Sequence, residues 1–433
     1  MAGIINNTSK LQIARDATFD EIIFDEDYTN RASRTFLADE LPYSTNLYAR
    51  VRHTSDVGTS DWSSTSRFKI KVPASVIGVC LDLKASEKGR FFWIDNEGRK
   101  VENYDYTRHP VFRNITMVTE DSGRTPVTMT KIPLFYIKTA TMGPPSTFSN
   151  GKKCWWISDV PLPGFRPHLA FKRSTAKTDG KFTISPYVTI GTYMANSETV
   201  GGKSCLGSGQ NRTVLHSQPY ANYKKFCANR NNETIGQVGW RLYDVYDEAL
   251  IRLLTIIMRC DADATKISSM GSMTTTGGST NRLVFVGTQN RPDIWIDDLW
   301  RFYYQYLDNI TLENYEIQLT SPMDNTTALK LGDVHKVAMN SGWIRDFAHS
   351  PMVVGDHTHN VQELFLPSIV TSAEAQSPIG DTLQAGKHPY MLVHGSYNRG
   401  SNELGLLHTA IVPDSGDISY VSPRTTGCRI CKN

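Results

Sequence analysis

The residue types best suited to chemistry occur around residue 357, in the segment Asp356-His-Thr-His359, with His349 upstream. In an extended segment His357 and His359 point the same way, so two imidazoles could bind one zinc or nickel ion. A loop with solvated histidines explains the same pattern without a metal, and it is the commoner situation. We therefore predict no metal site, and we keep His357 and His359 as candidate ligand-binding residues.

Cys428 and Cys431 are the one close pair among seven cysteines. A zinc site would need a second pair with similar spacing, and the sequence has none. A redox Cys-x-x-Cys normally opens a helix after a strand, whereas this pair lies in a segment that we expect to be the last β-strand. The cysteines are odd in number and scattered, so buried thiols are expected rather than a disulfide scaffold.

The remaining candidate motifs are weaker. Asp293, Asp297 and Asp298 could supply oxygen ligands to a calcium ion. Gly201-Gly-Lys-Ser204 lacks the upstream glycine spacing of a phosphate-binding loop, and the sequence contains no nucleophile elbow. These motifs predict no catalytic residue and no cofactor, so we predict that the protein is not an enzyme.

The composition predicts a globular chain without a nucleic-acid partner. Hydrophobic residues make up 39% of the 433 residues and aromatic residues 10%, which is too many for a disordered chain. The length predicts two or three domains. Lys plus Arg total 46 against 43 for Asp plus Glu, and the charges are interspersed, so we expect no nucleic-acid binding.

The sequence predicts neither secretion nor membrane insertion. Met1–Ser9 has no basic region followed by an apolar one, as a signal peptide would. The longest apolar run, Leu250–Met258, is far shorter than the ~20 residues that a bilayer span needs, and it contains Arg252. We expect synthesis and folding in a cytoplasm.

Residues 1–74 read as short strands separated by polar turns, a pattern typical of a β-sandwich. The alternation is clearest in residues 47–52, where apolar and charged or aromatic residues take turns. Residues 75–103 contain two strand-like pieces and the turn signal Asp95-Asn-Glu-Gly98, so we predict a β-hairpin connector.

Residues 104–433 read as a larger β-rich domain with some helix. The best helix spans Asp244 to Cys260, since apolar residues recur there at helical spacing. Acidic residues occupy its first turns and Arg259 its last, which suits the helix dipole. The fold class predicted for the whole chain is mostly β with some α.

Two pieces of the N-terminal region carry a family pattern: Leu41–Arg52 and Ser60-Asp-Trp-Ser63. They resemble the "L-x-x-x-T-x-Y-x-V-R-V-R … S-x-W-S" stretch of fibronectin type III modules, and the match covers residues 10–72. The resemblance implies a sandwich whose first strands are missing. We therefore expect a particle-anchoring module, 1–74, that is completed by a neighbouring subunit or docks on one.

The region after Ile132 contains separated segments with a shared order. They are Ile132–Lys138, Trp156–Phe171, Val188–Tyr193, Gly239–Asp244, Ile294–Ile310, Gly342–Phe347, Leu364–Ser368, His394–Leu407 and Gly427–Cys431. In this order they resemble a family of bacteriophage tail and fibre proteins, with patterns such as "WISD-x-PLPGF-x-x-HPAF" and "GGSYNNGS-x-AGLF". The family's domain has the C-type-lectin-like fold, which also contains formylglycine-generating enzymes and diversity-generating phage adhesins.

The resemblance also implies what this domain lacks. The enzymatic members use a close cysteine pair before their last strands, but no cysteine lies between Cys260 and Cys428. Copper-dependent thiol oxidation is therefore not implied. The calcium motif with which true C-type lectins bind carbohydrate, Glu-Pro-Asn followed by Trp-Asn-Asp, is also absent.

By this resemblance we expect a bacteriophage virion protein, a tail fibre or receptor-binding adhesin that recognises a host-surface glycan or protein. The candidate contacts are Tyr397, Asn398 and Arg399, together with the loop from His349 to Asn360. Other virion proteins are expected as partners, and a homo-oligomer, with a trimer favoured by the family. The alternative is a head decoration, collar or baseplate protein that binds only other virion subunits.

Overall fold

The computed structural model covers the chain in segments separated by gaps. The described residues are 6–29, 41, 46–69, 75–81, 91–120, 126–142, 152–173, 183–232, 238–261, 282–288, 291–297, 304–322, 327–329, 331, 338–355, 357–373, 379, 381–385, 389–393, 406–412 and 426–432. Strands dominate these residues, and the only α-helices among them are α1 (Pro110–Arg113), α2 (Tyr220–Ala228) and α3 (Val245–Arg259). The predicted class, mostly β with some α, is confirmed.

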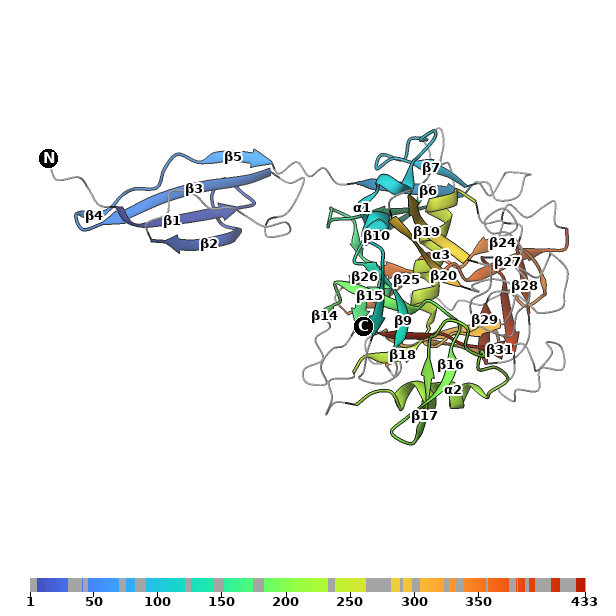
Figure 1. The fold of residues 1–433 in the computed structure, drawn as a ribbon. Coiled ribbons are helices and arrows are strands. Elements are labelled where there is room, and N and C mark those ends of the chain that lie inside the picture. The colour runs from blue at the N-terminus through green and yellow to red at the C-terminus, as the bar shows by residue number, and fades with distance from the viewer. Residues whose placement is uncertain are drawn as a thin grey trace. The chain divides into compact units, whose positions relative to one another are not determined.

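The chain divides into two compact units (Figure 1). The first comprises Met1–Ser75 and Val160–Arg166, and the second comprises Val76–Asp159 and Pro167–Asn433. All residues predicted as a connector except Ser75 therefore belong to the second unit, where β6 (Val76–Leu81) and β7 (Phe91–Ile94) pair as antiparallel strands.

The described strands of the first unit form one antiparallel sheet. Its order is β2-β1-β3-β4, and β5 also pairs with β3; the strands are β1 (Asn6–Ala14), β2 (Ile22–Tyr28), β3 (Asn46–Ser55), β4 (Gly58–Thr59) and β5 (Ser66–Lys69). We expected a two-layered sandwich here. Among the described residues there is one layer, and Ile13, Leu41 and Leu47 form its cluster of buried apolar side chains.

The motif residues of the first unit contact one another. Ser60 and Ser63 return to strand β3: their backbone N–H groups donate to the carbonyl oxygens of His53 and Val51, each at 2.8 Å. Their hydroxyls accept from the N–H groups of the same two residues at 3.0 Å. These serines therefore continue the hydrogen bonding of β3 where the segment has no strand structure of its own.

Trp62, between those serines, stacks with two arginines of β3. The guanidinium carbon lies 4.5 Å from the ring centroid for Arg50 and 4.7 Å for Arg52. Arg50 also lies over the ring of Phe19, at 4.0 Å. The alternation predicted for residues 47–52 thus places these arginines opposite buried Leu47, on a face where cation–π contacts organise the surface.

The second unit is built from three sheets. One contains β10-β11-β6-β7 in this order, where β10 is Tyr136–Met142 and β11 is Lys152–Ser158. Another has the order β18-β32-β15-β9-β8, and its strands are Trp240–Leu242, Ile430–Lys432, Tyr187–Gly191, Val127–Pro133 and Thr116–Glu120. The largest has the order β27-β24-β28-β30-β29-β21-β31, with strands Pro367–Thr371, Gly342–Phe347, Thr382–Gln384, Thr409–Val412, Tyr390–Val393, Tyr304–Tyr306 and Thr426–Gly427.

Short hairpins and turns complete this unit. The hairpins are β13–β14 (Lys172–Arg173, Thr183–Ile184), β16–β17 (Asn196–Val200, Lys203–Gly207), β19–β20 (Arg282–Thr288, Arg291–Asp297), β22–β23 (Ile310–Glu313, Glu316–Leu319) and β25–β26 (Pro351–Val354, His357–Asn360). The remaining described elements are β12 (Arg166–Pro167), which extends across the sequence boundary between the two units, and the 3-10 turns η1 (Tyr106–Arg108), η2 (Leu169–Phe171) and η4 (Val361–Leu364).

Helix α3 lies in the interior of the second unit, among its sheets (Figure 1). It begins after Asp244, whose side chain accepts from the N–H groups of Tyr246 and Asp247, and it ends at Cys260 in the left-handed conformation. Every helical residue except Arg259 is buried. The helix predicted from Asp244 to Cys260 is confirmed. Its buried apolar residues belong to the hydrophobic core that surrounds it.

Candidate functional site

The residues predicted to contact a ligand fall into two groups. Tyr397, Asn398 and Arg399 lie outside the described residues. His357 and His359 lie on β26, so the expected loop from His349 to Asn360 contains the antiparallel hairpin β25–β26. His349 is exposed, whereas His357 is half-buried and His359 is 1% exposed.

His359 belongs to the protein interior and not to an open loop. Its Nδ1 lies 2.8 Å from Oε2 of Glu363, and both side chains are fully buried. Oε1 of Glu363 accepts from the N–H of Asn360 as part of the cap of η4. The ring of His357 lies 6.4 Å from that of His359, centroid to centroid. The pair therefore shares one face, as expected, but the carboxylate of Glu363 orients the inner imidazole.

The charges of Glu363 and His359 also act on the pKa of a third histidine, His168. Its Nδ1 accepts from the N–H of Ala170 at 3.2 Å and caps η2, while its ring packs against Phe135 and Phe171. Burial lowers the pKa of His168 to about 3, so the imidazole is neutral at physiological pH. Across the described residues, no three His, Cys, Asp or Glu side chains are arranged to hold a metal ion.

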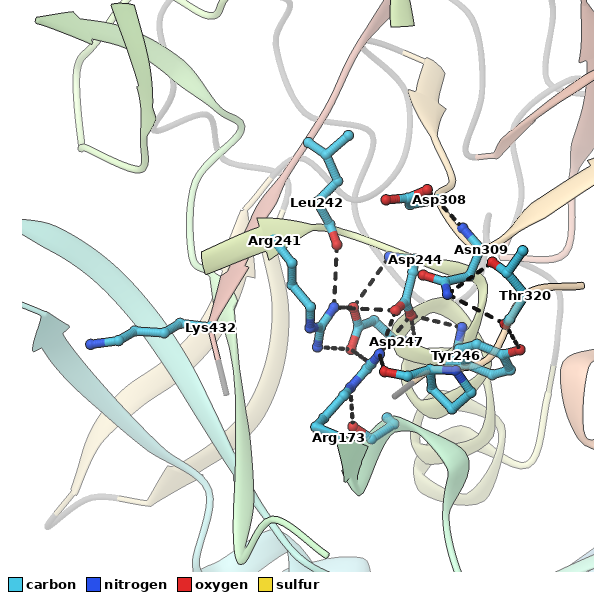
Figure 2. A network of polar contacts seen from close by, with 12 residues as sticks. Arg173, Arg241, Leu242, Asp244, Tyr246, Asp247, Asp308, Asn309, Thr320 and Lys432 are labelled. Atoms are coloured by element: carbon cyan, nitrogen blue, oxygen red, sulfur yellow. Dashed lines mark hydrogen bonds and ion pairs between the residues drawn. The ribbon is translucent and has the colours of Figure 1, made fainter. Parts of the chain in front are cut away.

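A polar cluster that sequence reasoning missed surrounds the first turn of α3 (Figure 2). Nη1 of Arg173 lies 2.7 Å from Asp244, and its Nη2 lies 3.1 Å from Asp247. Arg241 makes a two-pronged contact with Asp247, including Nη2 to Oδ1 at 2.8 Å. Two guanidinium charges thus balance two carboxylates, and all but Arg241 are fully buried. We call these four residues the charge quartet.

The acids of the quartet also cap the helix. Asp244 and Asp247 form a reciprocal capping box, which satisfies backbone N–H groups that begin the helix. Burial opposes ionisation of Asp247, but the two arginines hold its pKa below the ordinary value. For Asp244, burial outweighs Arg173 and raises the pKa. These contacts fix the entry of α3 into the core.

The quartet adjoins a second group of polar residues at Asp308 and Asn309 (Figure 2). The backbones of Val245 and Asp308 are hydrogen-bonded, N to O, at 3.1 Å. Asn309 donates from Nδ2 to the Ser321 carbonyl oxygen at 2.9 Å, and the Tyr246 hydroxyl donates to the Thr320 carbonyl oxygen at 2.6 Å. The group therefore ties the start of α3 to a turn more than sixty residues later.

Cys428 and Cys431 are 1% and 0% exposed. Cys431 lies in β32, and burial raises the pKa of both thiols well above the ordinary value. A buried thiol with a raised pKa is a poor nucleophile and a poor metal ligand, because both roles need the thiolate. Of the calcium candidates, Asp293 and Asp297 lie on β20 and Asp298 is outside the described residues.

No protein-family model matches this sequence, and no curated protein is significantly similar to it. Among the described residues, the helices are too short or too polar to cross a lipid bilayer.

Proposed function

We propose that this protein is a bacteriophage virion component, a tail fibre or receptor-binding adhesin, whose second unit is a C-type-lectin-like domain that presents binding loops to the host surface. The observation that carries the proposal is that the segments resembling the phage tail and fibre family converge on one framework. Three of them contain residues of the neighbouring strands β18, β32 and β15 of a single sheet, and a fourth, Ile132–Lys138, adds the last two residues of the adjacent β9. A set of chance matches scattered along the chain has no reason to meet in this way.

Side chains of these segments also contact one another. Arg429, in the last segment, is fully buried and donates from Nη1 to the carbonyl oxygens of Gly191 and Thr192, at 2.9 and 3.2 Å. Its own carbonyl oxygen accepts from the N–H of Tyr243 at 3.1 Å. The backbone N–H of Asp308, in a further segment, donates to the carbonyl oxygen of Tyr243 at 3.1 Å. The matched residues are thus scaffold residues, which is what a family of loop-displaying proteins would share.

The interior supports an adhesive rather than a catalytic role. The charge quartet and the buried cysteines are occupied in holding the scaffold, and a scaffold of this kind positions variable loops for binding. Tyr397, Asn398 and Arg399 remain the proposed contacts, and His357 with the exposed edge of hairpin β25–β26 is the second. His359 would act only by orienting that hairpin, since it is buried against Glu363.

The first unit is proposed to anchor the protein to the particle. Its support is the stacking of Trp62 on Arg50 and Arg52, because these are residues on which the fibronectin type III likeness depends. Assembly as a homo-oligomer, with a trimer favoured, belongs to the same proposal. The location of the protein on the virion surface is also part of this proposal.

The test uses the purified full-length protein and the host cells of the phage that encodes it. Saturating protein is expected to block phage adsorption, and replacing Tyr397, Asn398 and Arg399 together by alanine is expected to abolish the block. Glu102→Ala, an exposed change in the same unit, is the matched control. No block at saturation, combined with antibody labelling of the head or baseplate, would favour the alternative role of binding only other virion subunits.

A further inference from the structure

Strands β6 and β11 place two cysteines directly opposite each other. In their antiparallel register Cys80 pairs with Cys154, between the neighbouring pairs Val79–Trp155 and Leu81–Lys153. The two Sγ atoms are 3.0 Å apart, and both side chains are fully buried. Residues directly opposite in an antiparallel pair have Cα atoms about 4.5–5.5 Å apart, which falls within the range that a disulfide spans.

We propose that Cys80 and Cys154 are a modification site: a reversible cross-strand disulfide that locks β6 to β11. The sequence gives no sign of this pair, because 74 positions separate the two cysteines. It is the register of the sheet, and not their spacing along the chain, that brings them together. The close pair in the sequence, Cys428 and Cys431, is not the one that the fold brings into contact.

The site lies near one end of the β6–β11 ladder. Cys80 is one residue from the end of β6, and Cys154 is two residues from the start of β11. Only the pair Leu81–Lys153 lies between the cysteines and that end of the ladder. Exposing both thiols requires this end to open and Lys153 to leave its buried contact with Asp346, a local opening that costs less free energy than unfolding the whole sheet.

The reaction is thiol–disulfide exchange with a small disulfide such as oxidised glutathione. The thiolate of one cysteine attacks the oxidant, forms a mixed disulfide and releases one glutathione thiolate. The second cysteine, deprotonated, attacks the protein sulfur of the mixed disulfide and displaces the other glutathione. Two electrons and two protons leave the cysteine pair, and one oxidised glutathione becomes two reduced molecules.

The bond ties together the two ends of a long chain segment that includes β7, α1, β8, β9 and β10. Linking residues this far apart restricts the unfolded chain, so the oxidised protein is more stable. For a unit of this size the chain-entropy argument corresponds to a Tm increase of roughly 5 °C. The timing rests on the proposed function: thiols persist in the reducing host cytoplasm, and the bond forms after the particle leaves the cell.

The experiment equilibrates the full-length protein in glutathione buffers, from fully reduced to mainly oxidised. Remaining thiols are then alkylated and peptides are mapped without reduction. We expect a linked peptide pair containing Cys80 and Cys154, two mass units lighter than the sum of its reduced peptides, and a Tm that rises by roughly 5 °C and returns after dithiothreitol. Cys154→Ala and Cys80→Ala should lose the rise, while Cys431→Ala, equally buried in another sheet, should keep it.

Alkylation of both Cys80 and Cys154 at equilibrium in the oxidised buffer would overturn the proposal, and so would a linked peptide that joins other cysteines. The peptide map of the unaltered protein decides this even where an alanine variant folds poorly. The adsorption assay is independent: a disulfide without an adsorption block would remove the proposed function and the timing, and leave the modification site standing.

Discussion

The two units stabilise themselves in opposite ways. In the first, the described contacts are mainly on the surface: the serine hydroxyls that extend β3, the stack of arginines on Trp62, and a few buried apolar side chains. In the second, charged groups are withdrawn from water around α3 and balanced there. Surface contacts are individually weak and replaceable, whereas a buried charge without its partner is costly. Damage should therefore be mild in the first unit and severe in the second.

The largest expected effect is on the charge quartet. Arg173→Met leaves Asp244 and Asp247 facing each other in the interior with only Arg241, and the free energy of unfolding of the second unit should fall by about 3–5 kcal/mol. Urea unfolding followed by tryptophan fluorescence measures the loss. The matched change in the first unit, Lys10→Met, removes the half-exposed ion pair with Asp25 and should cost less than about 1 kcal/mol. Similar losses in both variants would end the contrast between the units.

The next effect is the loss of stability of the second unit in acid. The pKa of His168 is about 3 in the folded protein, below its ordinary value of 6.5, so the unfolded chain takes up the proton first as pH falls. The stability that depends on His168 is therefore fully present above pH 6.5. It declines as the pH falls toward 3, by up to about 1.4 kcal/mol per pH unit. His168→Asn retains an acceptor for the Ala170 N–H but cannot ionise. Urea unfolding of the second unit at several pH values should show a shallower slope for the variant, and an unchanged slope would assign the effect to other groups.

Close packing in the second unit gives an intermediate effect. A Cβ added at Gly78 would lie 2.5 Å from Cδ1 of Trp156 and 2.7 Å from the carbonyl oxygen of Trp155. Since one of these atoms is backbone and the ring is buried, the clash cannot be relieved cheaply. Gly78→Ala should lower the free energy of unfolding by about 1–3 kcal/mol, measured by urea titration. An unchanged free energy of unfolding would indicate that Gly78 has more room beside Trp155 and Trp156 than these distances allow.

The smallest effect is expected in the first unit. Trp62→Ala removes two partly exposed cation–π contacts, worth about 0.5–1 kcal/mol each. In calorimetry, the unfolding transition of the first unit should shift slightly to lower temperature, and that of the second unit should stay unchanged. Trp62→Phe keeps a ring beneath the arginines and should recover part of the loss. A loss above about 3 kcal/mol would show that this surface stack is as important as a core.

Much of the frame could be predicted from the sequence, since it depends on local patterns. The spacing of apolar residues and the acidic first turn gave α3 to within one residue at each end. The alternation of residues 47–52 gave a strand with Leu47 inside. Among the described residues of 1–74 the strands form one layer, and the predicted sandwich stays a prediction, because the pairing of strands into layers depends on contacts that alternation does not specify.

The site was harder to predict, because its pairings are distant in the chain. Asp244 and Asp247 carried a local signal, the capping-box spacing, but Arg173 precedes Asp244 by 71 positions, and no pattern joins them. His357 and His359 were correctly expected to point the same way, yet nothing nearby revealed that His359 would be buried against Glu363. The predicted contacts at Tyr397, Asn398 and Arg399 remain predictions, since they lie outside the described residues.

The position of β32 has a consequence for biosynthesis. Residues 430–432 are inserted between β18 and β15, in the middle of a sheet whose other strands come from residues 116–242. The sheet therefore cannot close until residues 430–432 have been synthesised, long after its other strands. Closing a loop of this length is slow. Until β32 pairs with β18 and β15, the sheet has an open edge that can bind chaperones or pair with another nascent chain.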